Sequence, residues 1–203
     1  MDAARATAED IQYVRQIAER GAHAPLLGGR FMIWWGALLA AAYTAHHFAL
    51  NGMIGPPEKI FAQIWLPFGM IGPLGHVLLT RSISSKSGAG SAGNQASRSV
   101  WVAATSVIVA MVIGSALAAR SGAGPATFDW VGPVAFGVYA CSLIVTGSLA
   151  NSKVTIVAGF GAVVMVGLFT AMILSPDRYL VAAAGILLTI LLPGVVLLRA
   201  EPR

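Results

Sequence analysis

The amino-acid sequence predicts an all-α polytopic integral membrane protein, in which six transmembrane helices form three helical hairpins behind a short N-terminal amphipathic helix. Six apolar runs of about twenty residues, none with a charge in its interior, lie between residues 31 and 198. About 20 residues of helix cross a bilayer core about 30 Å thick. Of the 203 residues, 57% are hydrophobic and 10% are charged, whereas soluble domains carry about 25% charged residues. The short connections between most runs pair sequence neighbours as antiparallel hairpins.

The expected domains are a cytoplasmic leader, a six-span transmembrane domain and a cytoplasmic tail. Their bounds are 1–30 for the leader, 31–50, 60–80, 100–119, 128–150, 154–174 and 179–198 for the spans, and 199–203 for the tail. The 81–99 link between the second and third spans is longer than the others and rich in Ser and Gly. This composition predicts a flexible tether.

The leader contains the one pattern typical of a soluble helix. Ile11, Val14 and Ala18 fall on one helical face, while the charged residues take other directions and nearly cancel. A helix that lies on a lipid surface is usually more basic. The three residues are therefore a candidate partner-docking face, for the protein's own cytoplasmic side or for another protein. The alternative is a solvated leader.

The even-numbered spans contain proline, whereas the odd-numbered spans do not. Pro67, Gly72 and Pro73 crowd the second span and His76 follows them closely. Proline removes a backbone donor and clashes with the preceding turn, so this helix is expected to kink or unwind. Discontinuous helices often line transporter sites, which makes these four residues a candidate substrate pocket. A closed packing joint is the alternative interpretation.

The odd-numbered spans carry small residues at four-residue spacing. Examples are Gly36 with Ala40, Ala110 with Gly114, and Ala158 with Ala162. Small residues let helix backbones approach closely in lipid, where the hydrophobic drive between helices is weak. The pattern predicts helix association, and it fits internal packing and a homo-oligomer equally well.

The distribution of basic residues predicts that both termini are cytoplasmic. With the N-terminus inside, the inner segments hold ten of the 13 Lys and Arg residues and the outer segments hold three. All five tryptophans sit near span ends, as in an interfacial belt. We therefore expect a multi-pass protein of the bacterial inner membrane, with the lipid bilayer as its first partner.

Several function classes are disfavoured by what the chain contains. The net charge of +5 comes from scattered residues without a basic patch, so no nucleic acid is expected as a partner. Cys141 is the single cysteine and permits no internal disulfide. His46 and His47 are separated from His76 by roughly 15–20 Å of membrane depth, too far to share a haem or a zinc ion. We expect no cofactor and no metal.

No span has an acidic residue in its interior. Asp129 and Asp177 lie at span ends and are expected at the outer surface. Ion-coupled carriers usually place charged groups at mid-membrane, and no catalytic set is visible either. We therefore expect a non-enzymatic membrane module that binds a partner or another subunit through its cytoplasmic N-terminal helix. The alternative is a small permease or channel subunit that uses the Pro/Gly-broken even helices.

The six-span topology can be checked by cysteine labelling. Cys141→Ser gives a cysteine-free background, because the chain has one cysteine. Single cysteines at Ser91 and Ala123 should then react with a membrane-impermeant maleimide from opposite sides of the membrane. Labelling of both positions from the same side would contradict the predicted topology.

Overall fold

The structure is a computed structural model that describes residue 12 and residues 26–84, 86 and 88–201. All regular structure in these residues is helical. The elements are α2 (Gly29–Leu50), η1 (Pro57–Lys59), η2 (Phe61–Trp65), α3 (Leu66–Ile83), α4 (Ala92–Ala118), η3 (Ala119–Ala123), η4 (Pro125–Trp130), α5 (Val131–Leu149), α6 (Lys153–Ala171), α7 (Arg178–Ile186), η5 (Leu187–Leu191) and α8 (Leu192–Arg199). The docking-face residues Ile11, Val14 and Ala18 lie outside the described residues.

Five helical runs of the described chain are long and apolar enough to cross a membrane. They cover residues 61–83, 92–123, 125–149, 153–171 and 178–199. The helix α2 has the necessary length of 22 residues, but its tryptophans, tyrosine and histidines lower its mean hydropathy. An all-helical chain with five or six helices of membrane length is thus confirmed. The orientation in a membrane stays a prediction.

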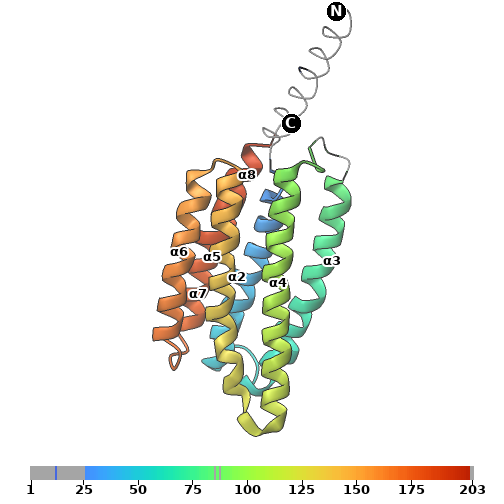
Figure 1. Ribbon diagram of the computed structural model, residues 1–203. Coiled ribbons are helices and arrows are strands. Elements are labelled where there is room, and N and C mark those ends of the chain that lie inside the picture. The colour runs from blue at the N-terminus through green and yellow to red at the C-terminus, as the bar shows by residue number, and fades with distance from the viewer. Residues whose placement is uncertain (1–11, 13–25, 85, 87, 202–203) are drawn as a thin grey trace, which may run out of the picture.

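The helix α2 is central to the bundle. It contacts α3 on one side and α7, η5 and α8 on the other. Figure 1 shows the helices running roughly along one long axis, with α3 at one edge and α6 at the other. The largest helix contact joins α5 to α6, and α4 packs mainly on α5. The last helical run packs more extensively on α2 than on its sequence neighbour α6, so the first and last helices of the bundle lie together.

Glycines set the two closest helix contacts. A Cβ atom added at Gly29 would lie 2.6 Å from the Leu198 nitrogen, and one at Gly194 would lie 2.7 Å from the Met32 Cβ. Between α5 and α6, a Cβ atom added at Gly147 would lie 2.7 Å from the backbone nitrogen of Ile156. These distances leave no room for a side chain, so the backbones themselves are in contact.

The helix α4 begins earlier than the sequence predicts. Its first residue is Ala92 instead of Val100, because Ser91 adopts an extended conformation and its hydroxyl accepts a hydrogen bond from the Asn94 amide. Ser is a favoured residue at this capping position. The connection expected over residues 81–99 is therefore confined to residues 84–91. Residues 92–99 belong to α4 instead, and two of them, Asn94 and Ser97, are buried polar residues.

A polar cluster joins α4 to α5. The Thr146 hydroxyl is fully buried, accepts a hydrogen bond from Trp101 Nε1 at 3.0 Å and lies 3.2 Å from the Ser97 hydroxyl. Toward the other end, Ser115 and Thr127 each donate a hydroxyl hydrogen bond to the other's carbonyl at 3.0 Å. Hydrogen bonds therefore supplement apolar contact along α4, of which few residues are buried.

Thr146→Val should destabilise the fold because it leaves Trp101 Nε1 without its acceptor and the Ser97 hydroxyl without its hydrogen-bond partner. We expect the free energy of unfolding in detergent to fall by about 0.5–2 kcal/mol. The matched control is Thr105→Val, since Thr105 is exposed and its hydroxyl donates to the Trp101 carbonyl of its own helix. Equal losses in the two variants, measured by chemical denaturation, would show that the cluster contributes nothing specific.

Candidate functional site

The four residues of the candidate substrate pocket all lie in α3 but point to different surroundings. Pro67 is half-buried at the start of the helix, Gly72 is buried, and Pro73 and His76 are exposed. Among these, the structure brings Gly72 and His76 together with side chains of α2 and leaves Pro73 on the uncovered side of the helix.

The expected breaks at proline take the form of π-helical turns. Before Pro67, the Leu66 amide donates to the Phe61 carbonyl, which closes the π turn η2. Before Pro193, the Leu192 amide donates to the Leu187 carbonyl in the same way and closes η5. Proline lacks the amide hydrogen that would continue the ordinary ladder, and a single π turn rearranges the preceding hydrogen bonds. Each Leu-Pro pair therefore follows a widened turn inside a continuous helical run.

Two indoles of α2 fill the space beside the glycines of α3. A Cβ atom at Gly72 would overlap the Trp35 ring, and one at Gly75 would overlap the Trp34 ring. Trp34 Nε1 donates to the Gly72 carbonyl at 3.1 Å. The glycine-rich face of α3 is therefore occupied by side chains of α2.

His76 completes this contact between α2 and α3. Its Nδ1 accepts a hydrogen bond from Trp35 Nε1 at 3.2 Å, and its ring lies 4.6 Å from that of Phe31. An acceptor at Nδ1 leaves the hydrogen on Nε2. The histidine therefore serves here as a hydrogen-bond acceptor for an indole.

Two further histidines, His46 and His47, lie in α2 away from this contact, and His46 belongs to a separate aromatic cluster. The His46 ring stacks on Tyr179 with centroids 3.7 Å apart, and its Nδ1 accepts from Trp65 Nε1 at 3.0 Å. His47 Nδ1 lies 3.2 Å from the Pro176 carbonyl. In the described part of the chain, no three His, Cys, Asp or Glu residues gather in an arrangement that could hold a metal ion.

Asp129, which is expected at the outer surface from the sequence, lies in η4 and is paired with a buried arginine. Arg178, whose side chain is 9% exposed, holds Asp129 with an Nη2-to-Oδ1 distance of 2.6 Å, and it also donates to the Tyr179 hydroxyl at 3.0 Å. The Asp129 side chain is 26% exposed, whereas that of Asp177 is 67% exposed. A guanidinium this deeply buried requires a close counter-ion, so the pair ties α7 to η4, just before α5.

A second charged cluster lies at the opposite end of the bundle. The side chain of Glu201 is 3% exposed, and its Oε2 lies 2.8 Å from Lys86 Nζ and 3.7 Å from Arg30 Nε. Next to it, Asn94 Oδ1 accepts a hydrogen bond from the Leu27 amide at 2.9 Å, and Asn94 Nδ2 donates to the Gly88 carbonyl. These contacts fix the segment that connects the leader to α2.

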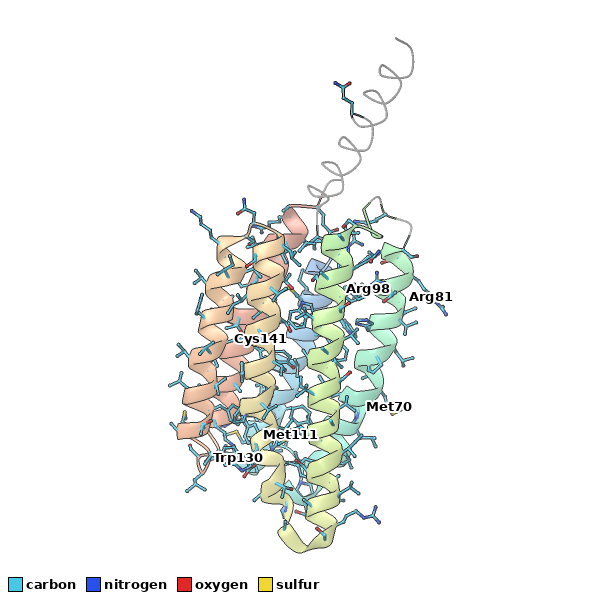
Figure 2. The ribbon with its side chains drawn as sticks, in the orientation of Figure 1. Met70, Arg81, Arg98, Met111, Trp130 and Cys141 are labelled. Carbon is cyan, nitrogen blue, oxygen red and sulfur yellow. The ribbon has the colours of Figure 1, made fainter. Side chains whose placement is uncertain are left out.

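Four of the five tryptophans are half-buried and form hydrogen bonds to other helical elements, and the interfacial belt stays a prediction. Trp130 is 50% exposed, near the η4 end of α5 in Figure 2. The indole donors and acceptors are Trp34 with the Gly72 carbonyl, Trp35 with His76, Trp65 with His46, and Trp101 with Thr146. Each of these bonds links two helical elements. In the sequence, each of these tryptophans lies in a different helical element from its acceptor, so the pairing could not be predicted from neighbouring residues.

Comparisons with known proteins identify no relative. No protein-family model matches the chain, and neither a curated protein nor a solved structure is similar to it. The assignment of function therefore depends on the geometry of the chain itself.

The contact between the indoles of α2 and the glycines of α3 predicts that replacing glycine by alanine has opposite effects on stability at two positions of α3. Gly75→Ala should lower the unfolding free energy by about 1–3 kcal/mol, because the new methyl group overlaps the Trp34 ring. Gly69→Ala is the matched control in the same helix. A Cβ there meets nothing within 4 Å, and alanine is the better helix former by about 1 kcal/mol.

Denaturation followed by tryptophan fluorescence measures both variants. Gly69→Ala should be neutral or stabilising. Equal stability of Gly75→Ala and Gly69→Ala would mean that the glycine-rich face of α3 is not filled by the indole.

Proposed function

We propose that this protein is a non-enzymatic membrane module that binds a partner protein or subunit through its N-terminal helix. The observation that carries the proposal is the anchoring of the leader junction. Leu26 and Leu27 are buried, with 6% and 5% of their surfaces exposed. The Leu27 amide is hydrogen-bonded to Asn94 of α4. The point at which the leader meets the bundle is therefore fixed.

The charged cluster around Glu201 extends this anchoring to three more segments. Glu201 follows α8, Lys86 belongs to the connection between α3 and α4, and Arg30 lies in the first turn of α2. Ion pairs at a low-exposure site depend on all their members being in place. Movement of the leader junction would therefore be transmitted to both the C-terminal helix and the connection at residues 84–91.

The contact between α2 and α3 bears on the alternative of a small permease or channel subunit. The π turns before Pro67 and Pro193 favour that alternative, because widened turns free backbone groups for a ligand. However, a path past Gly72 and Gly75 would require the Trp34 and Trp35 rings to leave the positions they fill. The partner-binding function needs no such rearrangement.

For the same reasons we propose that the junction lies on the cytoplasmic side of a bacterial inner membrane. At the end of the bundle where Glu201 follows α8, Arg30 and Lys86 are paired with this carboxylate, and Figure 2 shows Arg81 and Arg98 toward the same end. This arrangement agrees with the excess of Lys and Arg expected on the cytoplasmic side.

A double substitution on the docking face tests the proposal. Ile11→Asp/Val14→Asp removes two apolar side chains whose burial contributes about 1.5–3 kcal/mol each and places two charges on the same face. We expect normal insertion, loss of the co-purifying partner in mild detergent, and faster tryptic cleavage after Arg15 and Arg20.

The matched control is Gln12→Asp/Gln16→Asp, which adds the same two charges about 130–170° around the helix from the centre of the docking face. It should keep the partner and the wild-type cleavage rate. Equal cleavage of the wild type and of both variants, with the same proteins retained, would mean that the leader is solvated and binds no partner.

A further inference from the structure

The helices α3 and α4 are the least covered part of the bundle. In their most apolar windows 6% and 11% of residues are buried, against 33–50% in the runs 125–149, 153–171 and 178–199. They do not pack extensively on each other, although they follow one another in the chain. Exposed apolar side chains cover both helices: Leu66, Met70, Leu74, Val77 and Leu78 on α3, and Val102, Val107, Val109, Ile113 and Leu117 on α4.

Two exposed arginines stand at one end of this apolar surface. Arg81 lies about 3 Å along the axis from the end of α3, and Arg98 about 9 Å from the start of α4. Figure 2 shows both near the end of the bundle where residues 84–91 connect the two helices. An arginine side chain is long enough to bring its guanidinium from either depth to the same interfacial level.

Arg30 and Lys86 are paired with Glu201 at this end. Within the described residues, the other cations at this end form no ion pair and are exposed: Arg81, Arg98, Lys153 and Arg199. Of these four, Arg81 and Arg98 are the two that belong to α3 and α4. Of the described acidic residues, Glu201 is the one at this end, and its carboxylate already has two cationic neighbours. The end of the α3–α4 surface therefore presents positive charge without a counter-ion from this part of the chain.

We propose that an anionic phospholipid binds along α3 and α4, with its phosphate held by Arg81 and Arg98. Guanidinium groups bind phosphate through charge-assisted and often bidentate hydrogen bonds. The acyl chains cover the exposed apolar side chains that begin directly beneath the arginines. An occupant must therefore be both anionic and apolar, and a phospholipid combines the two properties.

A second copy of the chain fits this surface less well. Copies inserted in the same direction and related by a two-fold axis would bring the same ends together. Arg81 and Arg98 of one copy would then face the like charges of the other, which opposes association. A free phosphate ion would leave the apolar surface below the arginines uncovered.

The binding test uses the purified full-length protein in detergent and native mass spectrometry. The protein is titrated with phosphatidylglycerol or with phosphatidylcholine of identical acyl chains. The wild type should bind phosphatidylglycerol more tightly. Arg81→Gln/Arg98→Gln should weaken that binding about 30-fold, since each basic side chain near the surface contributes a factor of about five. Its binding of phosphatidylcholine should not change.

Three further variants separate the proposal from simpler explanations. Lys59→Gln/Arg120→Gln removes the same charge from exposed residues at the other end and should stay within twofold of the wild type. Arg81→Lys/Arg98→Lys keeps the charge and should restore most of the affinity. Ile11→Asp/Val14→Asp should keep the lipid, so that failure of the leader hypothesis is distinguishable from failure of this one.

Four outcomes would overturn the proposal. They are equal binding of the two lipids by the wild type, equal losses in the two Gln double variants, displacement of phosphatidylglycerol by millimolar inorganic phosphate, and a dimer in the native mass spectrum that persists at every lipid concentration. The first would show that binding does not depend on the charge of the headgroup, and the second would assign the binding to the overall charge of the protein. The third would indicate a phosphate site without a lipid requirement, and the fourth would indicate that a second copy covers α3 and α4.

Discussion

The close approach of α2 to the last helix is the contact on which the rest of the bundle depends. Gly29 and Gly36 of α2 and Gly194 of α8 leave no space for side chains, so the two backbones touch along several turns. In lipid the hydrophobic drive between helices is weak, and contact area at short range supplies the attraction. Because this contact joins α2 to the last helical run, it brings the two ends of the residue range 29–199 together.

The same contact decides how α3 can be attached. One side of α2 is taken by η5 and α8, so α3 packs on the other side, where Trp34 and Trp35 project. Glycines in α3 accept the rings, and the indole donors find acceptors on α3. Indole rings of α2 therefore hold α3, whereas close backbone contact at glycines holds the last helical run on the opposite side of α2. The helix α3 is consequently held by a single neighbour and keeps most of its surface uncovered.

Much of the fold could be predicted because hydropathy and helix length are local properties. The positions of the apolar runs agree with the helices. The prolines of the even-numbered spans indicated irregular helix, and π-helical turns precede Pro67 and Pro193. The orientation of small residues could not be predicted. Ala158 and Ala162 are buried between helices, whereas Ala110 and Gly114, at the same spacing, are exposed. Spacing defines a face of a helix, but the neighbour that covers this face is set by tertiary packing.

The partners of the charged and aromatic residues could not be predicted for a related reason. Arg178 and Glu201 are buried at the ends of helical runs, and each has a charged partner distant in the chain. Four tryptophans likewise point into the bundle, where their indole hydrogens reach acceptors on other helices. Neither pairing leaves a local signal in the sequence.

The polar contacts that were hardest to predict also locate the regions able to carry function. The charged clusters lie at the two ends of the bundle, around Arg178 and around Glu201, and the large apolar core lies between them. At mid-depth the hydroxyl groups of Ser142 and Thr189 donate to carbonyls of their own helices, which leaves few groups there that a polar substrate could use. Each end, by contrast, ties together segments that are far apart in the chain. The leader junction is therefore tied to α4 through Asn94 and, through Arg30 of α2, to Glu201 after α8, whereas the hydroxyl groups at mid-depth are already hydrogen-bonded.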